Sequence, residues 1–224
     1  MFEGFSKDTV RFLAGLCRNN DKSWFDDHRD DYDAHFVAPA KAFVEAIAAR
    51  LKKIDSSIQA VPKVNGSIMR INRDVRFSKD KSPYKDHLDL WFWSGNKKGW
   101  DTSGFFFRLT PARLMLGAGM HTFMPPVLAR YRKAVIDQRR GTAIAKVVAK
   151  LCDAGFDVGG ETYKKTPRGI DGGHPRASLL KHSGLYGGSE GKHPKELGSA
   201  ALVDFVLKRY AAMAPLHEWL RSIG

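Results

Sequence analysis

The sequence predicts an α+β fold, in which residues 1–224 form a single domain with an antiparallel sheet in the middle third, packed by N-terminal and C-terminal helices. Apolar residues recur at helical spacing in residues 1–60 and again after residue 125. Between residues 67 and 121 the pattern changes to short runs of aromatic and branched residues, which are typical of strands. Helices, then a meander of strands, then helices indicate the α+β class.

Residues 1–60 are expected to form helices. Ser6 is a suitable N-cap for the first helix, and Asn19–Asp21 ends it. A short second helix begins near Ser23, and we interpret the acidic run Asp26–Asp33 as a solvated helix face. The third helix carries the clearest apolar stripe, which consists of Phe36, Ala40, Phe43, Val44, Ile47 and Leu51.

The middle of the chain is expected to form strands. The last two are separated only by a Thr-Pro-Ala turn, which predicts an antiparallel hairpin. The expected strands cover residues 67–72, 87–94, 104–110 and 113–121.

The last third is expected to be helical apart from one irregular region. Helices are predicted from Pro125 to about Gln138, from Ala143 to Ala154, and at the C-terminal end of the chain. Residues 155–197 are rich in Gly, Pro, Lys and His, and they predict loops with a short strand near Tyr163. A long irregular segment in a compact domain is often functional.

The net charge of +13 is concentrated in the middle of the chain. Residues 1–66 carry ten basic and ten acidic side chains, whereas residues 67–140 carry fifteen basic and six acidic ones. A positive field of this kind attracts phosphates, nucleic acids or acidic metabolites. There is no apolar stretch near the roughly 20 residues of a membrane span and no signal-peptide pattern. Cys17 and Cys152 are expected to be reduced and buried, so we expect a cytoplasmic protein without a membrane partner.

The segment Arg70–Tyr84 is the most informative part of the sequence. Arginine suits bidentate recognition of carboxylate or phosphate, and the hydroxyl of Tyr84 can donate to an oxyanion. As a strand continuing from Ile68, the segment would place a basic strip beside an apolar strip. We therefore predict an anion-binding site composed of Arg70, Arg73, Arg76, Lys81 and Tyr84.

A structural interpretation of the same segment remains open. Asp74, Asp80 and Asp86 could pair with these cations and lock the chain without any ligand. Against it, the segment through Lys85 holds six cations and two acids, which leaves an excess of four positive charges.

The run Arg-x-x-Arg-Asp-x-Arg-Phe-x-x-Asp-Lys-x-x-Tyr resembles the signature of a mostly bacterial family of uncharacterised proteins, domain of unknown function 2461. Its members are about this long, and every position of the signature is present here, from Arg70 to Tyr84. Similar features occur at Asn19–Asn20, at Trp24–Phe25 and at Pro167–Gly169 before His174, so the resemblance covers nearly the whole chain. It implies no established activity.

A second constellation lies between Lys164 and His182. Its glycines would let backbone N–H groups approach a ligand, and Arg168 and Lys181 would add charge to an anion site. His174 is the best general acid or base, because histidine titrates near neutral pH. We predict Asp74 and His174 as the catalytic pair if the protein is an enzyme. A mobile surface loop is the alternative.

These residues predict a protein, or an enzyme, that binds a small phosphorylated or carboxylated molecule. The basic middle region also allows a nucleic-acid-binding protein, and a non-catalytic structural or interaction module is a third interpretation. No histidine lies at metal-binding spacing, and there is no Walker loop, dinucleotide fingerprint or nucleophile elbow, so we expect no metal and no cofactor.

Overall fold

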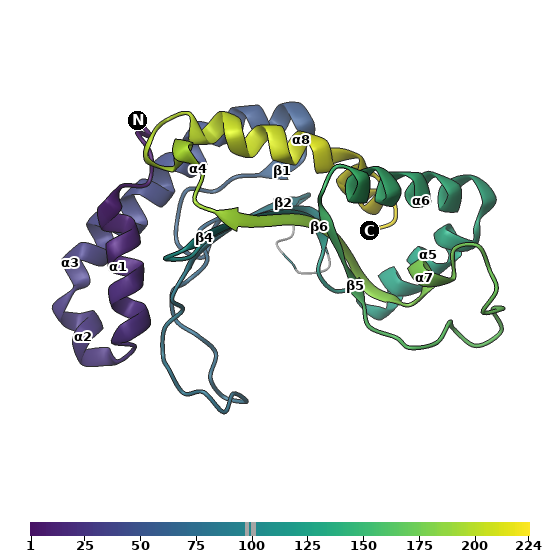
Figure 1. Ribbon diagram of the computed structural model, residues 1–224, viewed down its shortest axis with the longest axis horizontal. Helices are drawn as coiled ribbons and strands as arrows, with labels where there is room; N and C mark the ends of the chain where they lie inside the picture. Colours follow the sequence, from purple (N-terminus) through teal and green to yellow (C-terminus); the bar gives the residue numbers. More distant parts are fainter. Residues whose placement is uncertain (97–98, 100–101) are drawn as a thin grey trace. The chain divides into compact units, whose positions relative to one another are not determined.

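The computed structural model describes residues 1–96, 99 and 102–224, and it confirms the α+β class. Six strands form an antiparallel sheet in the order β1-β2-β3-β4-β6-β5 (Figure 1). The strands are β1 Ile58–Gln59, β2 Leu88–Ser94, β3 Gly104–Leu109, β4 Arg113–Met120, β5 Asp157–Glu161 and β6 His182–Lys192.

The helices follow the sequence pattern at both ends of the chain. The main helices are α1 Lys7–Arg18, α2 Lys22–Asp27, α3 Arg29–Asp31, α4 Ala38–Ile54, α5 Pro125–Ile136, α6 Gln138–Asp153, α7 Ala177–Leu180 and α8 Leu202–Arg221. Between α3 and α4 the chain forms the π-helix η1, Tyr32–Val37, and before α8 lies the 3₁₀ turn η2, Lys195–Gly198.

The chain divides into two compact units. Unit 1 contains Met1–Phe92, Phe106–Leu116 and Glu190–Arg209. Unit 2 contains Trp93–Phe105, Gly117–Ser189 and Tyr210–Gly224. Strands β2, β3, β4 and β6 and helix α8 therefore contribute residues to both units.

The N-terminal helices of unit 1 begin at side-chain caps. The Ser6 hydroxyl accepts hydrogen bonds from the first turn of α1, as the sequence predicts, and the Asp21 carboxylate accepts one from Trp24 N in α2. The apolar stripe expected from the sequence is buried, with Phe36 in η1 and the other five residues in α4. In this core the ring of Phe43 packs against Phe2, Phe5 and Phe107 with centroids 5.1 to 5.7 Å apart.

The segment that precedes β2 in unit 1 departs from the expected strand over residues 67–72. Only isolated bridges occur there, from Ile68 to Val64 and Leu90, and from Asn72 to Tyr84. Residues 73–83 form an irregular loop that extends away from the sheet (Figure 1). The carboxylates of Asp74 and Asp80 accept hydrogen bonds from nearby backbone N–H groups. Such local bonds favour turns over the backbone pairing of a strand.

Unit 2 contains an element that the sequence pattern did not reveal. The region 155–197, expected to be mainly loops, contains β6, which pairs with β5 from Asp157 to Glu161. A Cβ at Gly119 would meet the carbonyl of Leu185, and the backbone of Gly119 has a φ of +138°. The glycines thus allow close backbone approach between strands, which hides the strand pattern in the sequence.

The core of unit 2 contains a tyrosine and a histidine whose polar atoms are hydrogen-bonded. The hydroxyl of buried Tyr131 donates to Leu179 O at 2.8 Å, and buried His217 bonds the Ser103 hydroxyl through Nδ1 at 2.8 Å. The two cysteines do not belong to either core: Cys17 and Cys152 are free thiols on the surface, so their expected burial was wrong. Each occupies a helix position outside the apolar stripe.

Candidate functional site

Asn20 fixes the C-terminal end of the predicted anion-binding segment. Its side-chain amide donates to Tyr84 O at 2.9 Å, and its Oδ1 accepts from Tyr84 N at 3.0 Å. The asparagine side chain thereby replaces the backbone of a neighbouring strand. The Tyr84 ring stacks on Phe25 with centroids 4.3 Å apart, so Tyr84 is held against α2 over a separation of 64 residues.

A pocket of about 520 Å³ lies beside this anchor, within unit 1. One wall is helical and comes from α2, α3, η1 and α4, and the other comes from the loop that contains Asn65 and Asn72. Its apolar surface comes from the aromatic residues Phe25, Tyr32 and Tyr84 and from three aliphatic residues, Val37, Val64 and Ile71. A volume of roughly 300–1,000 Å³ is typical of small-molecule sites, and charged residues make up a large part of this lining.

The π-helix η1 shapes this pocket. It places Tyr32, Asp33 and Val37 on the lining. Tyr32 and Val37 are five residues apart, and a regular α-helix would turn them about 140° away from each other. On the facing loop, Asn65 has a φ of 63°, a left-handed conformation that asparagine tolerates better than most residues. Both features are local departures from regular geometry, and such departures are frequent at functional sites.

Arg70 is the arginine of the segment that lines the pocket. Within the described parts of the chain its guanidinium makes no hydrogen bond or ion pair. Tyr84 lines the same pocket, and burial, together with the nearby Asp26 carboxylate, raises the pKa of its hydroxyl. Tyr84 therefore stays protonated near neutral pH and retains a proton to donate.

The other two arginines lie outside this lining and are paired internally. Arg76 donates from Nε and Nη2 to the two oxygens of Asp74, at 2.9 and 2.6 Å. Arg73 forms an ion pair with Asp80 and donates to Ser82 O at 3.1 Å. Lys81 donates to Val75 O at 3.0 Å. Contacts of this kind are what we expect if the segment only locks its own chain. The role of these three cations in anion binding therefore stays a prediction.

The acids of the loop are strongly ionised. The hydrogen bonds from Arg76 lower the pKa of Asp74 to about 2. Hydrogen bonds from Ser82, followed by that from Arg73, lower the pKa of Asp80 to about 2. A carboxylate of so low a pKa is a weak proton acceptor near neutral pH, which counts against Asp74 as a general base.

The second predicted constellation lies in unit 2, whereas Asp74 lies in unit 1. His174 accepts a hydrogen bond from Arg176 N through Nδ1 at 3.1 Å. Lys181 Nζ lies 3.8 Å from Glu161 Oε1. Arg168 is exposed on the loop. Arg176, which the sequence analysis did not select, donates to Val135 O and Ile136 O and so attaches the loop to the end of α5.

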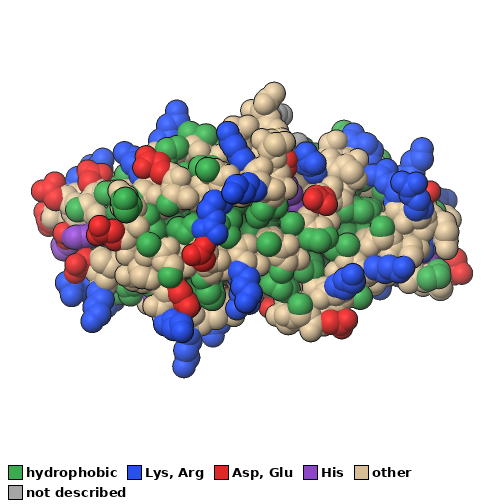
Figure 2. All heavy atoms as spheres, turned by 90° about the horizontal axis from the view of Figure 1, so that it is seen from above, with side chains coloured by type: hydrophobic (Ala, Val, Ile, Leu, Met, Phe, Trp, Pro, Cys, Tyr) green, Lys and Arg blue, Asp and Glu red, His purple; other side chains and the backbone are tan. Residues whose placement is uncertain are grey.

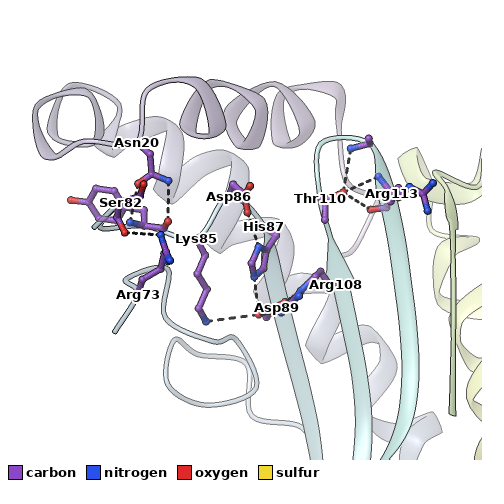
Figure 3. Close-up of polar contacts among 12 residues, drawn as sticks. Asn20, Arg73, Ser82, Lys85, Asp86, His87, Asp89, Arg108, Thr110 and Arg113 are labelled. Carbon is purple, nitrogen blue, oxygen red and sulfur yellow. Dashed lines mark hydrogen bonds and ion pairs between the residues drawn. The ribbon is translucent and has the colours of Figure 1, made fainter. Parts of the chain in front are cut away.

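A charged cluster around Asp89 was missed by the sequence analysis (Figure 3). Asp89 is only 6% exposed and receives two hydrogen bonds from Arg108, at 2.6 and 3.0 Å. His87 lies between two carboxylates, with Nδ1 2.8 Å from Asp86 and Nε2 3.2 Å from Asp89. Lys85 Nζ completes the cluster at 3.8 Å from Asp89.

This cluster ties β2 to β3 and has no member on the pocket lining. Burial raises the pKa of Asp89, but the contacts with His87 and Arg108 outweigh it and lower the pKa overall. The imidazole of His87 can donate to both carboxylates only as the imidazolium. His87 and Asp89 share a strand face in the sequence, yet Arg108 is a cross-strand partner that the sequence alone does not identify.

The described residues hold no group of three or more His, Cys, Asp or Glu side chains that could bind a metal ion. Every helix in the described part of the chain is too short or too polar to cross a bilayer.

The family model described as a conserved hypothetical protein, DUF2461, matches residues 8–219 of the 224. The chain belongs to the DUF2461 family. No curated protein matches the chain. In this DUF2461 protein the signature segment thus serves two structural purposes. Its ends, Arg70 and Tyr84, line the pocket, and its middle closes a loop through internal ion pairs.

Proposed function

We propose that the pocket lined by Arg70 and Tyr84 binds a small organic molecule that carries a phosphate or carboxylate group. The proposal depends on one observation, which concerns the contacts of the Arg70 side chain. Arg70 lines the pocket, and its guanidinium makes no hydrogen bond or ion pair with the described residues, whereas Arg73 and Arg76 are neutralised by internal acids.

The charge of the pocket supports the same proposal. Its lining contains three cations, Arg29, Lys41 and Arg70, against two acids, Asp26 and Asp33. The aromatic rings supply the apolar contact that a small ligand needs, and the protonated Tyr84 can donate a hydrogen bond. The proposal concerns binding and does not include proton transfer by Asp74 and His174.

Calorimetric titration with ethyl phosphate tests this function. Substituting Arg70→Gln removes the charge but keeps a long polar side chain, so folding is expected to be unaffected. Loss of a hydrogen-bonded charge contact of about 1.5–3 kcal/mol should weaken binding roughly 10- to 100-fold. The melting temperature should rise with ethyl phosphate in the wild-type protein and rise much less in the variant.

Arg76→Gln is the matched control, because Arg76 belongs to the same segment but not to the pocket lining. It should bind ethyl phosphate with wild-type affinity. Equal affinity of the Arg70→Gln variant and the wild-type protein, or loss of binding only in Arg76→Gln, would contradict the assignment to the pocket.

We also propose nucleic-acid binding as a second candidate function, because of the tip of the loop. Phe77 is 96% exposed there, with the Arg76 guanidinium 5.8 Å from its ring centroid and with exposed Lys79 and Lys81 nearby. An exposed aromatic ring beside cations suits stacking with an unpaired base. On the face shown in Figure 2, however, Lys and Arg side chains are dispersed and form no continuous stripe.

Fluorescence polarisation with a single-stranded RNA and a single-stranded DNA at two salt concentrations tests this second function. Binding should weaken steeply with salt, and Phe77→Ala should weaken it through the loss of about 1–3 kcal/mol of stacking. The control is Lys52→Ala, a surface substitution on α4. Phe106→Ala would not serve as the control, because Phe106 belongs to β3. Absence of binding at low salt rejects the function.

A further inference from the structure

We propose that the ligand of the Arg70 pocket is a zwitterion, and that Asp26 recognises its ammonium group. This inference rests on the proposed function, because it names the class of molecule that the same pocket accepts. The juxtaposition behind it is a pair of opposite charges, Arg70 and Asp26, that line one pocket without pairing with each other.

Asp26 is available for a cation. It lies on α2 at the helical wall of the pocket, and no hydrogen bond or ion pair engages its carboxylate within the described ranges. The negative charge of Asp26 acts on the pocket, because it is the second cause, after burial, of the raised pKa of the Tyr84 hydroxyl. Arg70 comes from the facing loop, so the two charges approach a ligand from different walls.

The aromatic surface beside Asp26 already accommodates a cation. The guanidinium of Arg29 lies 5.7 Å from the ring centroid of Phe25 and 5.6 Å from that of Tyr32. These rings belong to the pocket lining and attract a cation, but Arg29 already covers them and Tyr84 stacks on Phe25, so the ammonium group of the ligand depends on the Asp26 carboxylate. The other acid of the lining, Asp33, is not tightly paired with Arg29, because its Oδ2 lies 4.0 Å from Arg29 Nε.

The charge balance distinguishes a zwitterion from a simple anion. For a ligand with only a phosphate, Asp26 repels the ligand and weakens its binding. For a ligand with a phosphate and an ammonium, the same carboxylate attracts the second group. Removal of the Asp26 charge is therefore expected to change the affinities of two matched ligands in opposite directions.

Phosphoethanolamine and ethyl phosphate are the matched probes, because they share the phosphate and differ by one ammonium group. Calorimetric titrations at low salt should show about tenfold tighter binding of phosphoethanolamine to the wild-type protein. In Asp26→Asn this ratio should fall to about one, with ethyl phosphate bound as well as before or better. Asp27→Asn, on the same helix but outside the pocket lining, should keep the wild-type ratio.

The outcomes separate the two proposals. Equal binding of both probes to the wild-type protein, or a tenfold ratio that persists in Asp26→Asn, overturns the zwitterion inference and leaves the anion-binding function in place. Failure of the wild-type protein to bind either probe overturns both proposals. Loss of both probes only in Arg70→Gln, together with loss of discrimination only in Asp26→Asn, supports both.

Discussion

At the residue scale, the signature segment divides its charges between two tasks. Arg73 and Arg76 hold the loop together through Asp80 and Asp74, whereas Arg70 lines a pocket. The arginines are thus equivalent in the sequence pattern but different in the structure. What separates them is the presence of an acid within reach in the folded loop, which depends on backbone geometry and not on spacing.

Asn20 lies outside the pocket lining but holds Tyr84, which belongs to it, so its substitution should affect this site. Asn20→Ala removes both hydrogen bonds to the backbone of Tyr84. We expect a loss of about 1–3 kcal/mol in the free energy of unfolding, measured by urea denaturation. Asn19→Ala, which loses only one amide bond to Gly15 O, is the control and should cost less. Equal losses in the two variants would contradict the anchoring role of Asn20.

At the element scale, the π-helix and the 73–83 loop determine the two walls of the site. Neither follows from residue preference. The sequence over Tyr32–Val37 fits a continuous α-helix, and the alternating pattern after Ile68 fits a strand. The extra residue per turn in the first case, and side-chain hydrogen bonds to the backbone in the second, override the local pattern.

The loop should open when its internal tie is removed. Arg73 bonds both Asp80 and Ser82 O, so Arg73→Ala removes two ties across the loop and leaves the contact of Lys81 with Val75 O and the backbone bond from Arg73 N to Pro83 O. Chymotrypsin should then cleave after the exposed Phe77 at least about threefold faster than in the wild-type protein, because cleavage follows local opening.

Arg76→Ala provides the comparison for this proteolysis. Its partner Asp74 is only two residues away, so the pair does not cross the loop. Its cleavage rate should remain close to that of the wild-type protein. If both variants are cleaved at the wild-type rate, then the tie made by Arg73 does not restrain the loop.

At the scale of the whole molecule, much of the fold could be predicted and much of the site could not. The α4 stripe, the hairpin of β3 and β4 and the start of α5 at Pro125 are strong periodic or turn signals, and the structure confirms them. Strand β6 was missed because its glycines replace the apolar alternation of a strand. The contacts of Asn20 with Tyr84 and of Asp89 with Arg108 join distant segments, which spacing alone cannot reveal.

Acid should destabilise the protein through its paired aspartates. Their folded pKa values are lowered, for Asp74 and Asp80 to about 2 and for Asp86 and Asp89 in direction. A lowered folded pKa gives stability that is present above the unfolded pKa of about 4 and is lost as the pH falls through the folded value. The melting temperature should therefore decrease between about pH 4 and pH 2.

Asp89→Asn separates the buried cluster from the exposed loop in this experiment. The variant should lose about 3 kcal/mol of stability at neutral pH, since Arg108 keeps its charge but loses a buried partner. Its melting temperature should depend less on pH below about 4 than that of the wild-type protein. Asp27→Asn, an exposed control, should follow the wild-type curve; a wild-type slope in Asp89→Asn would exclude a role for the cluster.

The way in which the chain alternates between the two units has a consequence for the gene. Each unit is assembled from three separate stretches of sequence, and the boundary interrupts β2, β3, β4, β6 and α8. No single truncation can therefore release either unit intact. Recombination could not easily exchange one unit as a module, and a family model that spans residues 8–219 without interruption is what such inheritance would produce.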